Sequence, residues 1–339
     1  MFAFSGFFST ASRTTIIMAT IHTKIKLNNG VEVPIIGSGA WAPADPEAQG
    51  RVKDWIGSAL KNGFRHIDTA QGYGTEAAVG EAVRASGIPR QEIFVTTKLP
   101  WNHQGRVKES FEDSFKNLNL GYIDLYLLHW PQAIVYEEGN DAPRNEDGTF
   151  KTTDQFNFSQ AWADIEKLLD TGKVKAIGVS NFSIKNLEKL FETAKIIPAV
   201  NQVELHPYLA QNALRDYCTR KGIVLTAYTP SGYSKVRSDP LIVSLAEKYG
   251  VTPNQVTLAW HLSRRTIIVP KSENSERQKE NITVPKISEE DLEKIWTLDK
   301  GERICNKAHP KNGQVWGWTY EQLGWVDCRH QSTSLHQNL

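Results

Sequence analysis

The chain has 339 residues, of which 40% are hydrophobic and 23% are charged, a composition typical of a soluble globular protein. Its 39 basic and 38 acidic residues nearly balance, which excludes the basic surplus expected of a nucleic-acid-binding protein. Cys218, Cys305 and Cys328 show no paired spacing, so we expect reduced thiols and a cytoplasmic location rather than a disulfide framework.

Residues 1–20 are expected to form an N-terminal extension, which contains Arg13 and several hydroxyl groups but no acidic residue. Neither this stretch nor any other has an apolar run long enough to span a membrane, so no membrane association is expected. Two interpretations remain open: an organelle transit segment, or a stretch upstream of a second start at Met18, which we favour. We expect residues 21–339 to form one domain, because no Pro-, Ser- or Gly-rich linker divides them.

From residue 21 onward, short apolar runs alternate with amphipathic segments of helical length, the pattern of repeated βα units and a parallel sheet. After a β-hairpin at 21–34, the apolar runs predict eight strands: 33–39, 64–69, 93–98, 123–129, 174–180, 199–205, 223–228 and 266–271. Apolar residues at three- and four-residue spacing predict helices at 46–63, 75–86, 105–120, 158–172, 183–194, 211–222 and 252–265. Eight such units predict an α/β fold, the (β/α)8 TIM barrel.

Polar residues end several of the predicted strands. Asp68, Lys98 and His129 end three of them, and Tyr73 follows the first of these three closely. Active sites of such barrels lie at the carboxyl ends of the strands, so we expect these four side chains to converge there.

This set of side chains suits proton transfer to a carbonyl group. A phenol with a pKa of about 10 is a poor proton donor at neutral pH unless its surroundings assist it. Lys98 would stabilise the phenolate form of Tyr73, and Asp68 would pair with the lysine and keep it charged. His129 could orient a carbonyl oxygen toward the phenol. Reduction of that carbonyl also needs a hydride, which no side chain supplies, so a nicotinamide cofactor is implied.

From about Lys26 to Pro310 the sequence resembles the aldo-keto reductase superfamily. The segments "GFRHIDTAQGYGTE" (63–76), "IFVTTKLPW" (93–101) and "LYLLHWP" (125–131) are similar to the family's motifs around its catalytic residues. The resemblance implies that Tyr73 is the general acid, that Lys98 and Asp68 tune it, and that His129 orients the substrate. It also implies that the C-terminal tail forms a substrate loop over the barrel.

The same resemblance implies an NADPH site. "GVSNF" (178–182) and "NQVELHP" (201–207) are similar to the region that holds the nicotinamide amide, and "VPKSENSERQKEN" (269–281) to the adenosine 2′-phosphate site. Two cations and a hydroxyl suit a dianionic phosphate, which favours NADPH over NADH while leaving dual use open. The expected cofactor residues are Ser180, Asn181 and Gln202 on the amide, Tyr228 stacked on the ring, Lys271, Ser272, Asn274 and Arg277 on the phosphate, and Glu280 and Asn281 near the adenine.

Trp41, Trp101 and Trp130 are the expected substrate-pocket residues. The polar, poorly periodic stretch 132–158 is the expected substrate-side loop, and it is similar to the loop of fungal-type glycerol dehydrogenases, glyceraldehyde reductases and xylose reductases. The resemblance therefore implies reduction of aldehydes or aldoses such as glyceraldehyde and xylose, reversible as polyol oxidation. We expect a monomer, with a dimer as the alternative. The tail 315–325 holds three tryptophans, which either shape the pocket or pack as core.

Other interpretations are less well supported. "GSGAWA" (37–42) matches a dinucleotide fingerprint, but Pro43 and Pro46 prevent a helix from beginning at once. Tyr217 and Lys221 have the spacing of a short-chain dehydrogenase pair, without the serine that should precede them. A glycosidase would need two acids at strand ends, and no His/Cys spacing suggests a metal. A barrel that senses NADPH with little turnover remains the alternative function.

Overall fold

The computed structural model describes residues 23–325; the expected extension at 1–20, with Met18, and Cys328 lie outside this range. Eight parallel strands form the central sheet in chain order. A parallel bridge between Ile36 and Ile268 joins the first strand region to the last and closes the barrel, which confirms the predicted fold. The strands are β3 (Ser38–Gly39), β4 (His66–Asp68), β5 (Phe94–Leu99), β6 (Ile123–Leu128), β7 (Val174–Ser180), β8 (Val200–Glu204), β9 (Val224–Tyr228) and β10 (Ile267–Ile268).

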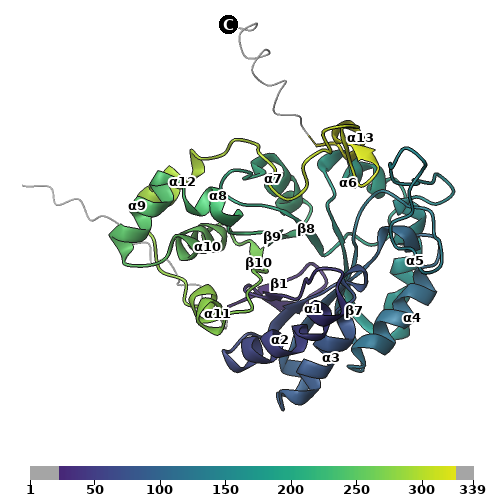
Figure 1. Ribbon diagram of the computed structural model, residues 1–339, viewed down its shortest axis with the longest axis horizontal. Helices are drawn as coiled ribbons and strands as arrows, with labels where there is room; N and C mark the ends of the chain where they lie inside the picture. Colours follow the sequence, from purple (N-terminus) through teal and green to yellow (C-terminus); the bar gives the residue numbers. More distant parts are fainter. Residues whose placement is uncertain (1–22, 326–339) are drawn as a thin grey trace, which may run out of the picture.

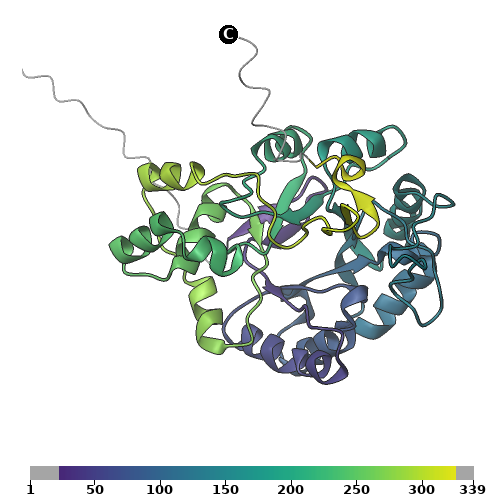
Figure 2. The ribbon, with the colours of Figure 1, turned by 45° about the horizontal axis from the view of Figure 1, so that its top comes forward.

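Helices surround these strands (Figures 1 and 2). β5 and β6 are buried along their whole length, as expected of parallel strands covered on one face by helices and filled by side chains on the other. The main helices are α1 (Pro46–Gly50), α2 (Val52–Lys61), α3 (Glu76–Ala85), α4 (Val107–Leu118), α5 (Phe158–Leu168), α6 (Ile184–Phe191), α7 (Asn212–Arg220), α9 (Pro240–Tyr249), α10 (Pro253–Ser263), α11 (Ser275–Ile282) and α12 (Glu289–Trp296). Within residues 23–325, no helix has the length and apolar character needed to cross a membrane.

The predicted hairpin is also present, as β1 (Lys24–Lys26) paired antiparallel with β2 (Glu32–Pro34). Its turn is tied to the amino-terminal ends of two barrel strands: Asn29 donates to the carbonyl of Lys175, and Asn28 to the carbonyl of Pro198. The hairpin therefore covers the end of the barrel opposite to the carboxyl ends of the strands.

The structure differs from the sequence prediction in several places; no helix was predicted at α11 or α12, for example. The single helix expected at 46–63 is two helices, because Arg51 both ends α1 and begins α2. The connection after β9 contains two helices that were not predicted, the short α8 (Tyr233–Arg237) and α9, before α10. The stretch 132–157 lacks helices but is folded back on itself by bridges between residues 134 and 152 and between 144 and 150.

After α12 the chain crosses the barrel to its far side, where α13 (Tyr320–Leu323) lies beside α6 (Figure 1). On the way it forms a small hairpin of β11 (Gln314–Val315) and β12 (Trp318–Thr319). The ammonium of Lys185 and the amide of Asn186, both on α6, donate to the carbonyls of Glu321 and Leu323. These contacts hold the C-terminal segment across the carboxyl-terminal end of the barrel.

Candidate active site

A cavity of about 1160 Å³ opens at the carboxyl ends of the strands. Tyr73, His129 and Trp41 line one part of it, and Arg277 and Asn281 line another. One continuous space thus joins the predicted catalytic residues to the predicted phosphate site. Its size suits a dinucleotide together with a small substrate, since cavities for drug-sized ligands typically measure about 300–1,000 Å³.

Asp68, which lines the cavity, forms a buried ion pair with Lys98, which lies behind the cavity wall. Lys98 Nζ donates to Asp68 Oδ1 at 2.8 Å and to the carbonyl of Thr69 at 2.8 Å. Burial alone would lower the pKa of this ammonium, but Asp68 and Tyr73 outweigh it, and the pKa lies above its usual value. The lysine side chain, which is fully buried, is therefore charged at neutral pH. The expected pairing of Asp68 with Lys98 is present.

Tyr73 lies between this ammonium and His129. Lys98 Nζ is 5.0 Å from the centre of the Tyr73 ring, and the rings of Tyr73 and His129 meet edge to face with centroids 5.6 Å apart. Burial raises the pKa of Tyr73 above its usual value, although Lys98 partly opposes this shift, so the phenol carries its proton at neutral pH. Burial, with Lys98 as a smaller cause, holds the pKa of His129 well below its usual value and keeps the imidazole neutral.

A tight turn presents Tyr73 to the cavity. Tyr73 ends a short 3-10 helix, and Gly74 follows it in the left-handed region with φ +67°. The Gln49 amide donates to the Tyr73 carbonyl at 3.0 Å, and a Cβ at Gly74 would lie only 2.6 Å from that amide nitrogen. The backbone conformation therefore favours glycine at residue 74, and a larger residue would also have to displace the Gln49 side chain.

The residues expected at the nicotinamide form a hydrogen-bonded group. Tyr228 donates to Asn181 Oδ1 at 2.7 Å, and Asn181 Nδ2 donates to the carbonyl of His129 at 3.0 Å. Asn181 has φ +67°, a conformation that asparagine tolerates better than most residues. Gln202 donates to Asp68 Oδ2 at 2.7 Å, a link that the sequence did not indicate. Ser180 does not line the cavity; its hydroxyl donates to the Gln202 carbonyl, so its expected cofactor contact stays a prediction.

At the other part of the cavity, Lys271, Ser272 and Arg277 lie together, as expected for a phosphate site. Glu280 and Asn281 also line this part, but Asn274 does not. Asn274 instead caps α11, where its side chain accepts a hydrogen bond from the Arg277 backbone at 3.0 Å. Its expected contact with a phosphate therefore stays a prediction.

The three expected pocket tryptophans differ in their surroundings. Trp41 is 53% exposed on the cavity wall, whereas Trp130 is buried against Val315, Leu323 and Trp325 of the tail. Trp101 packs on Trp316 with ring centroids 5.1 Å apart, and its indole N–H donates to the carbonyl of Asp141 at 3.0 Å. The expected loop and tail thus meet at Trp101. Of the tail tryptophans, Trp316 lines the cavity, whereas Trp325 packs as core against Trp130.

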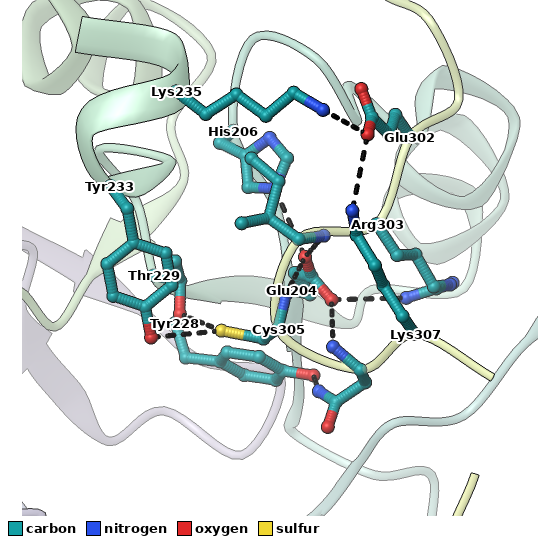
Figure 3. Close-up of polar contacts among 12 residues, drawn as sticks. Glu204, His206, Tyr228, Thr229, Tyr233, Lys235, Glu302, Arg303, Cys305 and Lys307 are labelled. Carbon is teal, nitrogen blue, oxygen red and sulfur yellow. Dashed lines mark hydrogen bonds and ion pairs between the residues drawn. The ribbon is translucent and has the colours of Figure 1, made fainter. Parts of the chain in front are cut away.

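Sequence reasoning missed the residues that hold the tail over the cavity. Glu204 is fully buried at the end of β8, and its carboxylate accepts from the backbone N–H groups of Cys305 at 2.9 Å and Asn306 at 3.3 Å (Figure 3). Burial would raise the pKa of Glu204, but the His206 hydrogen bond, Arg303 and the backbone N–H groups of Cys305 and Ile304 lower it below its usual value. Glu204 therefore stays ionised beneath the tail.

This anchor places two further side chains in the cavity wall. The Asn306 amide donates to the Tyr228 hydroxyl at 2.6 Å, and the Cys305 thiol lies 2.8 Å from the Thr229 hydroxyl (Figure 3). Both residues line the cavity. In the sequence, only the polar residue Glu204 near a strand end pointed to this anchor. Its partners could not be identified, because they lie about a hundred residues later.

Within residues 23–325, no three His, Cys, Asp or Glu side chains gather closely enough to hold a metal ion, and the expectation that no metal is used stays a prediction. Cys218 and Cys305 are free thiols.

Comparison with known proteins identifies the class. Residues 35–300 match the sequence profile of the aldo/keto reductase family. "Glycerol 2-dehydrogenase (NADP(+))" of Saccharomyces cerevisiae is 40% identical over 306 residues, covering 86% of this chain and 96% of that protein. "Aldehyde reductase YPR1" of the same yeast is 40% identical over 286 residues, covering 81% and 90%. The solved aldose reductase of Schistosoma japonicum superposes with a TM-score of 0.79 at 34% identity, covering 84% of this chain and 94% of that one.

These matches extend over most of each protein, and the chain is an oxidoreductase enzyme. It belongs to the aldo/keto reductase family.

Proposed function

We propose that this enzyme reduces aldehydes and aldoses to alcohols with NADPH, and in reverse oxidises polyols. The observation that carries the proposal is the fully buried ammonium of Lys98, held by Asp68 behind the cavity wall and within reach of the Tyr73 ring. Burying a charge is costly, and a buried ion pair adds little to stability even when it is well paired. An ion pair buried beside a protonated phenol in a cavity therefore favours a role in proton transfer over a purely structural one.

The cavity fits a dinucleotide phosphate. It extends from the hydrogen-bonding groups of Asn181 and Gln202 to the cations Lys271 and Arg277. The amides would hold the nicotinamide carboxamide, Tyr228 would stack on the ring, and the cations would hold the 2′-phosphate, with Glu280 and Asn281 near the adenine. When bound there, NADPH supplies the hydride for the carbonyl carbon.

Tyr73 then supplies the proton. Its hydroxyl protonates the carbonyl oxygen as the carbon is reduced, and the phenolate that forms is stabilised by Lys98. His129, being neutral, has one ring N–H, which would donate a hydrogen bond to the carbonyl oxygen and orient it toward the phenol. Asp68 keeps the lysine charged and placed. In polyol oxidation the same groups act in reverse, with Tyr73 as the base.

The substrate class is inferred from the cavity wall and from the relatives. Trp41 and Trp101 offer apolar surface, while Asn306 and His129 offer hydrogen-bonding groups, which suits a small hydroxylated aldehyde. The names of the yeast relatives refer to glycerol, to an aldehyde and to NADP(+), and they support the same pairing of substrate and cofactor. We further propose a monomer, because residues of one chain suffice to line the cavity, and a cytoplasmic location.

The proposal is tested by measuring NADPH consumption by the purified protein with glyceraldehyde, xylose and an aromatic aldehyde, with NADH in parallel. Turnover of the two hydroxylated substrates is expected, and recovery of NADPH on adding glycerol and NADP+ would show the reverse reaction. A protein that binds NADPH but reduces none of these carbonyls would instead be a sensor of the cofactor, and the proposed function would be wrong.

A further inference from the structure

A carboxylate lies among the cations proposed to hold the 2′-phosphate. Beside the main cavity is a hollow of about 340 Å³, lined by Lys271, Ser272, Glu273 and Arg277. Lys271, Ser272 and Arg277 line the main cavity as well, so this hollow is the phosphate end of the same space. Glu273 adds a negative charge where a dianion is expected to bind.

Glu273 already forms an ion pair with Lys271. Lys271 Nζ donates to Glu273 Oε1, and on its other side the ammonium lies 4.7 Å from the centre of the Trp55 ring. The hydrogen bond from Lys271 is the largest cause that holds the pKa of Glu273 below its usual value, and the charges of Arg51 and Arg277 add to it. The carboxylate is thus ionised at neutral pH. A 2′-phosphate that binds Lys271 must displace it or remain beside it.

The two nicotinamide cofactors differ at this point only. NADPH carries a dianionic phosphate, which a neighbouring carboxylate repels. NADH carries a 2′-hydroxyl instead, which can donate a hydrogen bond to an acidic side chain. Lys271 and Arg277 therefore favour NADPH, while Glu273 favours NADH.

We propose that Glu273 is a specificity-determining residue: it weakens the enzyme's preference for NADPH over NADH, so that NADH binds as well. This inference rests on the proposed function, since it assumes a nicotinamide cofactor in the cavity. It assigns a role to a residue that sequence reasoning passed over, because only Lys271, Ser272, Asn274 and Arg277 were expected at the phosphate.

The test is direct binding, measured by isothermal titration calorimetry of NADPH and NADH with the wild type and Glu273→Gln. Glutamine keeps the size of the side chain and removes its charge. We expect the variant to bind NADPH about three- to tenfold more tightly and NADH no more tightly, with the gain shrinking as salt is added. The matched control is Glu276→Gln, three residues later in the first turn of α11, because Glu276 pairs with Lys279 and does not line the hollow. It should change neither affinity.

The inference is overturned if Glu273→Gln leaves the ratio of the two affinities unchanged. This would be the case if neither affinity changed or if both increased by the same factor. In that case a wild type that still binds and oxidises NADPH leaves the proposed function standing. A wild type that binds neither cofactor contradicts both proposals.

Discussion

The position of Lys98 accounts for the states of the residues around it. Its ammonium is surrounded by Asp68, the Thr69 carbonyl and the Tyr73 ring, and it has no exposed surface. Because the lysine stays charged, it opposes protonation of His129 and limits how far burial raises the pKa of Tyr73. The phenol keeps its proton and the imidazole is neutral, which is the pair of states that reduction needs.

These states predict the pH dependence of reduction. The turnover number should stay constant between about pH 6 and pH 8, because His129 is already neutral and Tyr73 still protonated throughout this range. It should fall only at alkaline pH, as Tyr73 loses its proton. The measurement is the rate at saturating aldehyde and NADPH across this range, with His129→Gln as a control that should be slower but equally flat. A step in the wild-type rate near pH 6.5 would show that His129 titrates.

At the scale of elements, close packing of helices constrains single residues. α3 lies against the end of α4 at Gly80, where an added Cβ would meet the carbonyl oxygen of Leu118 at 2.1 Å. Arg84, one turn further along α3, donates to that carbonyl at 2.8 Å and so satisfies the end of α4. The glycine allows this approach of the two helices.

Gly80→Ala should therefore destabilise the protein by about 1–3 kcal/mol, because the backbone of α4 must move to make room. Gly57→Ala is the matched control: Gly57 is also inside a helix, α2, but an added Cβ there meets nothing within 4 Å. Alanine at that position should stabilise by about 0.5–1 kcal/mol through helix propensity. Urea denaturation of both variants measures the difference. Equal effects of the two substitutions would mean that α3 and α4 are not in close contact.

The elements also show what the sequence could reveal. Asp68 and Lys98 end neighbouring strands, so their meeting followed from strand order alone. The contact of Glu204 with Cys305 and Asn306 could not be predicted, because the tail has no periodic pattern and its path depends on contacts with a barrel strand about a hundred residues earlier. The division of the 46–63 helix at Arg51 was likewise invisible, since its apolar spacing continues through that residue.

For the whole molecule, three histidines with lowered pKa values link stability to pH: His66 and His261, which are buried, and His129 in the cavity wall. Burial lowers the pKa of His66 to about 4 and that of His261 to about 3, and it lowers that of His129 well below its usual value. In the unfolded chain each would have a pKa of about 6.5, so below that pH the unfolded state binds more protons than the folded state.

The free energy of unfolding should therefore fall as the pH is lowered from about 6.5 toward 4, by up to about 1.4 kcal/mol per pH unit for each histidine. Urea denaturation at about pH 7 and pH 5 measures the change. His66→Gln, which removes one of the three titrating groups, should reduce the slope. Stability that stays constant over this range would contradict the neutral state of these side chains.

The central claim is that Tyr73 gives the proton while the cofactor and substrate are held by other residues. The most direct measurement is a single turnover of enzyme-bound NADPH with glyceraldehyde in the wild type and in Tyr73→Phe, with NADPH binding followed separately by the quenching of tryptophan fluorescence. We predict that the variant binds NADPH as the wild type does but oxidises it at least about a hundredfold more slowly, as expected when a general acid is lost. A variant that binds NADPH and oxidises it at the wild-type rate would show that the proton comes from another group.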